Sequence, residues 1–173
     1  VKAGDKAGCD LIIIETMNDP YELKAAVLAA KENSNLPIFA TFVLDESGKT
    51  MTGCDIPSMV AMLESLGVSA LGVNCSLGAD KLKTFVPEVI ANASVPVIVK
   101  PNAGLPDLKT GKYSMCAEEF ASLMAKFYEK GAVIMGGCCG TSPEYIASLK
   151  KILDKTGIQE KPEAIKGVIS GAT

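Results

Sequence analysis

The sequence predicts a parallel α/β fold, in the form of an incomplete (β/α)8 TIM barrel of about five βα units. Five short segments rich in branched apolar residues alternate with helical patterns along the 173 residues. The apolar segments are nearly continuous, which is typical of parallel strands that are buried on both faces. Their starts lie about 26 to 37 residues apart, close to the ~31 residues per unit of an eight-unit barrel. No G-x-G-x-x-G motif follows the first strand, which argues against a dinucleotide-binding doubly wound sheet.

The elements follow from these patterns in order. Strands are expected at 11–15, 37–43, 70–75, 96–100 and 133–138. Apolar residues spaced as on one face of a helix predict helices over 23–30, 59–66, 82–90 and 120–127. A further helix is expected to begin at Thr141-Ser142-Pro143-Glu144, where a hydroxyl cap, a first-turn proline and a glutamate coincide. Residues 1–8 resemble the end of a preceding helix.

Five units do not close a barrel. The chain is therefore interpreted as the last five units of an eight-unit barrel, with the three N-terminal strands missing. One domain is expected over 1–160, and 161–173 is expected to be the start of a linker.

The composition indicates a soluble, globular chain, with 48% hydrophobic and 21% charged residues. A net charge of −3 gives no basic surface for nucleic acid, and no apolar run approaches the ~20 residues needed to cross a membrane. With no signal-peptide pattern, a cytoplasmic location is expected. In that setting the six cysteines favour metal binding or catalysis over disulfides, and the absence of histidine excludes histidine bases and ligands.

Three cysteines fall at predicted strand ends, where barrel enzymes place their chemistry. Cys138 and Cys139 are adjacent, and Cys75 ends a strand two positions away in the sheet, so the backbones are expected to lie roughly 10 Å apart. The glycines that flank the pair, Gly137 and Gly140, permit a turn that directs both thiols to one ion. We expect the three thiolates to bind one zinc whose open fourth position takes a substrate thiol. The other cysteines, Cys9, Cys54 and Cys116, are expected to be small buried hydrophobes.

The two cysteine motifs resemble a known family. Gly72-Val73-Asn74-Cys75, together with Gly136-Gly137-Cys138-Cys139-Gly140-Thr141, is similar to the paired signature of the zinc-dependent homocysteine S-methyltransferases. The stretch 100–106 is closest to the homocysteine-binding domain of the cobalamin-dependent methionine synthases. This resemblance implies homocysteine as methyl acceptor, methionine as product, methylcobalamin on another domain as methyl donor, and cobalamin- and folate-binding domains as partners.

Four further polar residues lie near the same strand ends. The resemblance implies that Glu15 contacts the amino group of homocysteine, whereas the residue alone could be a solvated or helix-capping carboxylate. Asn74 and Asn102 are interpreted either as substrate-binding and loop-orienting residues or as turn formers. Lys100 is expected to extend its ammonium to solvent.

Two other functions remain open at this stage. Gly136, Gly137 and Gly140, followed by a helix N-terminus, could cradle a phosphate, as in other barrel enzymes, and the thiols would then be incidental. Alternatively, the chain could be an inactive barrel fragment that serves only as a folding unit.

Overall fold

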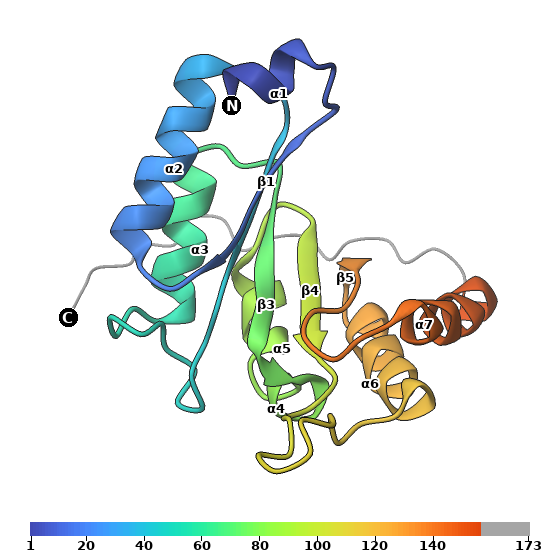
Figure 1. The fold of residues 1–173 in the computed structure, drawn as a ribbon. Coiled ribbons are helices and arrows are strands. Elements are labelled where there is room, and N and C mark those ends of the chain that lie inside the picture. Colours follow the sequence, from blue (N-terminus) through green and yellow to red (C-terminus); the bar gives the residue numbers. More distant parts are fainter. Residues whose placement is uncertain (157–173) are drawn as a thin grey trace.

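A computed structural model describes residues 1–156 and contains one parallel sheet. Its five strands are β1 (Ile12–Met17), β2 (Ile38–Phe42), β3 (Ala70–Gly78), β4 (Val97–Asn102) and β5 (Ala132–Met135). They lie side by side in sequence order, β1-β2-β3-β4-β5 (Figure 1). A doubly wound sheet reverses its strand order at a switch point, so this sequential order is consistent with part of a (β/α)8 barrel, as predicted.

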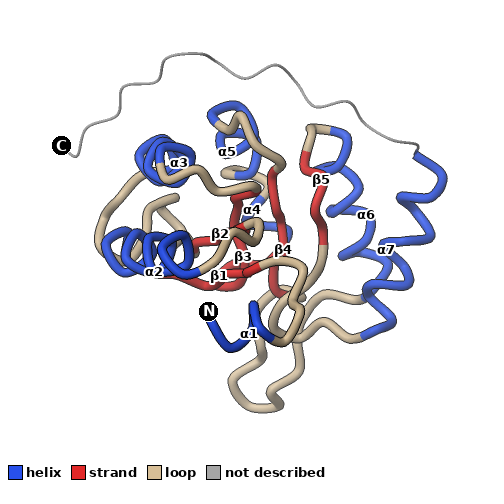
Figure 2. Tube along the Cα trace, turned by 90° about the horizontal axis from the view of Figure 1, so that it is seen from above, coloured by secondary structure: helices blue, strands red, loops and turns tan. Residues whose placement is uncertain are grey.

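Helices connect consecutive strands, and one further helix lies at each end of the described chain. They are α1 (Lys2–Lys6), α2 (Pro20–Asn33), α3 (Ile56–Ser65), α4 (Ala79–Leu82), α5 (Val86–Asn92), α6 (Ala117–Glu129) and α7 (Pro143–Thr156). Figure 2 shows α2, α3, α5, α6 and α7 in an arc around one side of the sheet, with α1 on the other side. All strands therefore end at the same edge, and the segments that follow them gather there.

Aspartates fix the start of two helices. Asp19 accepts hydrogen bonds from the backbone N–H groups of Tyr21 and Glu22 at the start of α2, over 2.7 and 3.0 Å. Asp55 accepts one from Ser58 at the start of α3, over 2.9 Å. Each helix also has a proline in its first turn, where no N–H donor is needed.

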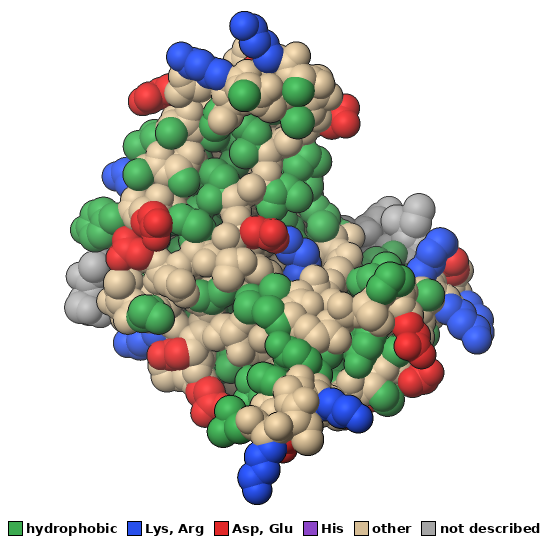
Figure 3. All heavy atoms as spheres, in the orientation of Figure 1, with side chains coloured by type: hydrophobic (Ala, Val, Ile, Leu, Met, Phe, Trp, Pro, Cys, Tyr) green, Lys and Arg blue, Asp and Glu red, His purple; other side chains and the backbone are tan. Residues whose placement is uncertain are grey.

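The core lies between the sheet and the arc of helices. Fully buried side chains from the helices meet those of the central strands, and they include Leu23, Val27, Met59, Leu63, Leu71, Val89, Phe120 and Met124. Figure 3 shows that hydrophobic side chains also cover much of the viewed face, with most charged groups at its margin. The prediction that every strand is buried on both faces is wrong for β1, where Ile13 is 51% exposed. This strand has a neighbour on one side only within residues 1–156.

Three other expectations need correction. The helix predicted over 82–90 is broken into α4 and α5, because Pro87 lacks an N–H and its ring clashes with the carbonyl of Lys83, four residues earlier. The strand predicted over 133–138 ends at Met135, so the vicinal cysteines lie in the following loop. Cys9 and Cys116 are exposed and Cys54 is half-buried, since all three lie in loops or at a helix start.

The start of the last helix is confirmed at Pro143. The predicted linker at 161–173 and the last residues of the predicted domain lie outside the described residues. Among residues 1–156, no helix is both long enough and apolar enough to cross a membrane.

Candidate metal centre

The thiols of Cys75, Cys138 and Cys139 converge at the carboxyl-terminal edge of the sheet. The Sγ atoms of Cys75 and Cys139 are 3.7 Å apart, those of Cys138 and Cys139 are 4.0 Å apart, and all three lie within 4.8 Å of one another. Three sulfurs on a tetrahedral zinc, each at about 2.3 Å from the metal, would lie about 3.8 Å from one another. The donor type and the spacing therefore fit a three-thiolate zinc site.

A local change of backbone direction turns Cys75 towards the other two thiols. Cys75 and Ser76 both adopt left-handed conformations, with φ of 57° and 60°. The pairing of β3 with β4 shifts register between Asn74 and Gly78, at the same place. The Ser76 hydroxyl donates to the carbonyl of Leu44 over 2.9 Å, which holds the distorted segment against the loop after β2.

The loop that carries Cys138 and Cys139 is fastened to the end of β4. The N–H of Cys138 donates to the carbonyl of Pro101 over 2.8 Å, and the N–H of Ala103 donates to the carbonyl of Cys139 over 2.9 Å. Gly140 has a φ of +80°, and the Thr141 hydroxyl donates to the carbonyl of Cys138 over 2.7 Å. This hydroxyl therefore closes the cysteine turn.

Asn74, which is 1% exposed, joins three elements beneath the thiols. Its Oδ1 accepts from the backbone N–H of Thr16 over 2.9 Å and from the hydroxyl of Thr41 over 2.7 Å. Its Nδ2 donates to the hydroxyl of Thr16 over 2.7 Å and to Sγ of Cys138 over 3.9 Å. Thr16, with a φ of 65°, is itself left-handed, so Asn74 stabilises strained backbone on β1 while it orients a thiol.

Asn102 performs a similar task on the other side of the centre. Its side chain is buried, and its Oδ1 accepts from the backbone N–H of Cys139 over 3.1 Å. Hydrogen bonding from the Asn102 side chain also lowers the pKa of Cys75. Both asparagines thus contact the cysteine loops directly.

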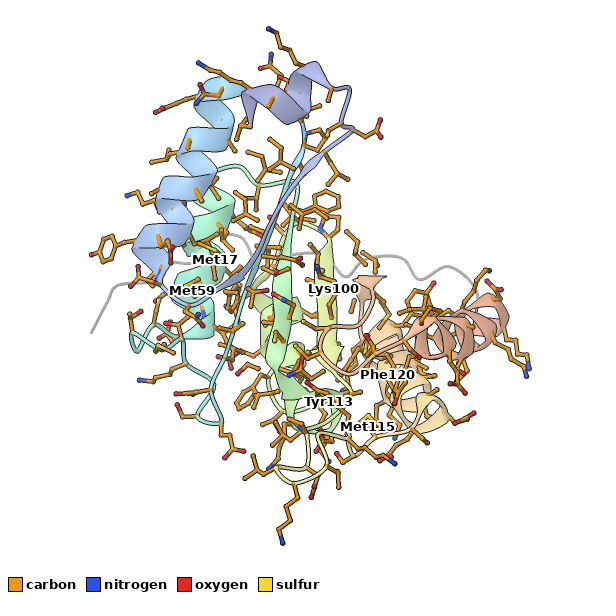
Figure 4. The ribbon with its side chains drawn as sticks, in the orientation of Figure 1. Met17, Met59, Lys100, Tyr113, Met115 and Phe120 are labelled. Atoms are coloured by element: carbon orange, nitrogen blue, oxygen red, sulfur yellow. The ribbon has the colours of Figure 1, made fainter. Side chains whose placement is uncertain are left out.

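Glu15 on β1 and Lys100 on β4 form an ion pair. The pair lies on the inner side of the sheet, the face opposite the arc of helices. The expectation that Lys100 extends to solvent is therefore wrong: its side chain is 21% exposed, its stem packs on Gly136, and its ammonium contacts the Glu15 carboxylate. Figure 4 shows Lys100 beside the central strands. The Glu15 side chain is 51% exposed, so one side of the carboxylate remains accessible.

Tyr113, from the loop between β4 and α6, is a site residue that the sequence did not reveal. Its ring lies on Gly140, so close that a Cβ built there would fall 2.2 Å from the ring carbon Cγ. The pKa of Tyr113 is raised by burial, by the charge of Cys139 and by a hydrogen bond to that thiolate. Neither periodicity nor a motif marks this tyrosine in the sequence.

The thiols differ in acidity without a cation. Burial pushes the pKa of Cys75 upwards, but hydrogen bonds from the Ser76 backbone, from Cys138, Cys139 and Asn102 outweigh it, and the net pKa is lowered. Burial, followed by the hydrogen bond and charge of Cys75, raises the pKa of Cys138 to about 11. Ionised Cys75 therefore opposes ionisation of Cys138, and a bound cation would favour the thiolate form of both.

The homocysteine S-methyltransferase family model matches residues 1–153 of the chain. The chain belongs to the homocysteine S-methyltransferase family. It is 36% identical over 147 residues to a methionine synthase of Mycobacterium tuberculosis and 35% identical to that of Mycobacterium leprae, covering 80% of this chain and 12% of each relative. Among solved structures, the metallated form of the homocysteine methyltransferase MmuM from Escherichia coli superimposes with a TM-score of 0.73 at 26% identity, covering 87% of this chain and 47% of that one. The apo form gives a TM-score of 0.70 at the same identity, covering 87% of this chain and 52% of that one.

In this homocysteine S-methyltransferase family member, the glycine-rich turn is already filled by side chains. The Tyr113 ring covers Gly140, and a Cβ at Gly137 would meet Thr141 Oγ1 at 2.4 Å. Side chains of the chain itself therefore already pack against the backbone at Gly137 and Gly140. A pocket of about 350 Å³ does open beside Pro37 and Ile38, but it lies at the amino-terminal end of β2, away from the cysteines.

Proposed function

We propose that this chain is the zinc- and homocysteine-binding part of a methyltransferase that transfers a methyl group to the thiol of homocysteine and gives methionine. The observation that carries the proposal is the mutual approach of the Cys75, Cys138 and Cys139 sulfurs to within 4.8 Å. Membership of the homocysteine S-methyltransferase family supports the substrate, and the Escherichia coli relative has been solved in a metallated form.

The proposed roles follow from the geometry. When bound, zinc would supply the positive charge that keeps the substrate thiol deprotonated beside the three protein thiolates. Cys75, Cys138 and Cys139 would hold the ion, and the substrate thiol would take its remaining position. Asn74 donates to the sulfur of Cys138, and Asn102 accepts from the backbone N–H of Cys139, so both residues hold the cysteine loop in place.

Glu15 is proposed to bind the ammonium group of homocysteine. Its carboxylate faces the inner side of the sheet at the same edge as the thiols and is half-exposed. Lys100 occupies one side of that carboxylate, so the substrate ammonium would have to share Glu15 with the lysine. The ion pair with Lys100 orients the Glu15 carboxylate before the substrate binds. The lysine ammonium also competes with the substrate ammonium for this carboxylate.

The methyl donor is proposed to be methylcobalamin carried on another domain, with cobalamin- and folate-binding domains as partners. The mycobacterial relatives support this branch of the family, because they are methionine synthases of which this chain spans 12%. The chain spans about half of the Escherichia coli structure, and the remaining barrel strands are proposed to complete the amino-acid pocket.

Metal analysis of the purified chain tests the proposal. We expect about one zinc per chain, lost in Cys75→Ser and retained in Cys116→Ser, which removes an exposed thiol outside the cluster. After chelation, three of the six cysteines should become newly reactive to a thiol reagent. A chain that binds no zinc, or a Cys75→Ser protein that retains it, would refute the metal centre.

The role of Glu15 needs a separate test. Glu15→Gln should weaken homocysteine binding, measured by calorimetry on the zinc-loaded chain, while the zinc content stays the same. The carboxylate contacts Lys100 and none of the three thiols, so it has no reason to affect the metal. Loss of zinc from the Glu15→Gln protein would contradict the role given to this residue.

A further inference from the structure

The turn that carries the vicinal cysteines lies at the surface of the molecule. Cys139 and Gly140 are exposed and Cys138 is half-buried, so the protein core does not enclose the turn. Gly140 is left-handed, with a φ of +80°, and glycine has more accessible backbone conformations than any other residue. An exposed turn of this kind opens locally unless other segments hold it. Its thiols therefore depend on outside contacts to keep the positions that suit a metal ion.

Hydrogen bonds from the end of β4 hold the two cysteines of the turn. The N–H of Cys138 donates to the carbonyl of Pro101 over 2.8 Å. The N–H of Cys139 donates to Oδ1 of Asn102 over 3.1 Å, and the carbonyl of Cys139 accepts from the N–H of Ala103 over 2.9 Å. These bonds fix the peptide groups on both sides of Cys139, one residue before the glycine.

The ring of Tyr113 packs on the glycine itself. A Cβ built at Gly140 would overlap three carbons of this ring, Cγ, Cδ1 and Cδ2, so the ring lies directly on the glycine backbone. Tyr113 is half-buried, although its loop lies at the surface. Because packed atoms leave little free space between them, the ring restricts the conformations that Gly140 can adopt.

The loop that carries Tyr113 holds the ring in place by hydrogen bonds of its own. Pro106 and Tyr113 form an isolated antiparallel bridge, so the chain doubles back immediately before the tyrosine. Asp107 closes the turn between them, accepting from the backbone N–H groups of Lys109 and Thr110 over 3.0 and 2.8 Å. The backbone of Tyr113 is thus positioned by the fold of its own loop.

The end of the same loop is attached to the last helix. The N–H of Met115 donates to the carbonyl of Ala103 over 3.1 Å, and the hydroxyl of Tyr145, in α7, donates to the carbonyl of Met115 over 2.6 Å. The ring of Tyr145 also packs edge-on against Phe120 of α6, with the ring centroids 5.6 Å apart. The loop behind Tyr113 is therefore fastened to the helical layer, and its ring is a firm support for the cysteine turn.

We propose that Tyr113 is a positioning residue whose ring holds the turn at 138–141 in the conformation that presents Cys138 and Cys139 to zinc. A site whose ligands are already ordered loses less free energy to ordering when the ion binds. The ring carries this role, so the hydroxyl is not required for it. The role rests on the proposed function, because it assumes that these thiols bind zinc.

Zinc affinity, measured by competition with a chromophoric chelator, tests this role. Tyr113→Ala should bind zinc about tenfold more weakly than the wild type, as expected when a residue that supports a metal ligand is lost. Tyr113→Phe keeps the ring on Gly140 and should bind zinc as the wild type does. Tyr21→Ala, at an 81% exposed tyrosine on α2, is the matched control and should change nothing. The zinc-free Tyr113→Ala chain should remain folded by far-ultraviolet circular dichroism, because Tyr113 is only half-buried.

A second measurement tests whether the ring acts through Gly140. In the wild-type chain, Gly140→Ala should weaken zinc binding in two ways, through the positive φ of this residue and through overlap of its Cβ with the ring. In the Tyr113→Ala chain the overlap is absent, so the same change should cost less zinc affinity. Equal losses in the two chains would overturn the inference, since the two residues would then act independently.

The remaining outcomes separate this role from the proposed function. Unchanged zinc affinity in Tyr113→Ala would overturn the role and leave the proposed function standing. Equal losses of affinity in Tyr113→Phe and Tyr113→Ala would also overturn it, because the hydroxyl and not the ring would then support the turn. An unfolded Tyr113→Ala chain would overturn it as well, since the ring would then support the whole fold. Failure of the wild-type chain to bind zinc would overturn both the role and the proposed function.

Discussion

Replacing Asn74 by alanine should destabilise the chain and weaken metal binding at the proposed centre together. The change removes the acceptor of two donors, the backbone N–H of Thr16 and the hydroxyl of Thr41, and Thr41 is fully buried. A buried donor left without a partner costs about 1–3 kcal/mol. The buried Thr41 hydroxyl carries that full cost and the part-buried N–H of Thr16 a smaller one, so the expected loss in the free energy of unfolding is about 2–4 kcal/mol. That is a large share of the ~5–15 kcal/mol typical of a domain.

Urea denaturation followed by far-ultraviolet circular dichroism provides the measurement, since the chain has no tryptophan to report by fluorescence. The midpoint should fall while the slope with urea stays the same, because the surface exposed on unfolding hardly changes. Asn92→Ala is a matched control: Asn92 is half-buried, and its side chain makes one exposed hydrogen bond, to the carbonyl of Glu88 within its own helix. Its unfolding free energy should stay within about 0.5 kcal/mol of the wild type.

Asn74→Asp separates the two roles of the amide. The carboxylate keeps both acceptor interactions, with Thr16 N–H and the Thr41 hydroxyl, but its charge is buried, so only part of the stability should return. It has no N–H to donate to Cys138, and it adds a negative charge beside the thiolates. Its zinc affinity should therefore fall below that of the wild type. An Asn74→Ala protein as stable as the wild type, with unchanged zinc affinity, would refute the reasoning.

Three further changes test other contacts. Gly140→Ala should cost about 2 kcal/mol or more and release zinc, because the residue has a φ of +80° and its Cβ would enter the Tyr113 ring. Gly8→Ala is the control, because Gly8 has a φ of +83° but no atom lies within 4 Å of a Cβ built there. It should lose only the stability that the unfavourable backbone conformation costs. If urea denaturation gives the same loss of stability for Gly8→Ala and Gly140→Ala, the contact with Tyr113 is refuted. Asp55→Ala should remove about 1 kcal/mol at pH 7 by deleting the cap of α3. Hydrogen bonds from Ser58 lower the pKa of Asp55 in the folded chain. The stabilisation by Asp55 is therefore present above its ordinary pKa of about 3.9, and it disappears as the pH falls through the lower pKa of the folded state. If the difference in unfolding free energy between the wild type and Asp55→Ala does not shrink in acid, the cap is refuted. Lys100→Met should tighten homocysteine binding to the zinc-loaded chain by removing the competitor for Glu15, and weaker binding in calorimetry would contradict this.

Most of the fold could be predicted from the sequence because its signals are local. Branched apolar runs and i, i+3, i+4 spacing located five strands and the helices between them, and Thr141 to Glu144 correctly marked the last helix start. The break before Pro87 was also a local signal, but it was outweighed by the apolar spacing on both sides of the proline. Exposure of Ile13 could not be predicted, because it depends on which strands lie beside β1.

The candidate centre could be predicted only in part. The approach of Cys75 to the vicinal pair follows from topology, because the ends of parallel strands share one edge of the sheet. The ion pair from Glu15 to Lys100 required the curvature of the sheet, which brings β1 and β4 together although two strands lie between them. Tyr113 required the fold of an irregular loop, and hydrophobic periodicity carries no information about such a loop.

Strained backbone conformations occur at the strand ends that direct side chains into the proposed site. Thr16, Cys75 and Ser76 are the non-glycine residues with positive φ among those described, and each such conformation costs about 1–3 kcal/mol. Thr16 follows Glu15, and Cys75 is itself a thiol donor, so the strained positions are those that aim the proposed site. Asn74 lies between them and hydrogen-bonds to Thr16 on one strand while it precedes Cys75 on another. One buried amide therefore stabilises the backbone conformation on the two strands that supply the carboxylate and the first thiolate, which is why its loss should be felt in stability and in metal binding at once.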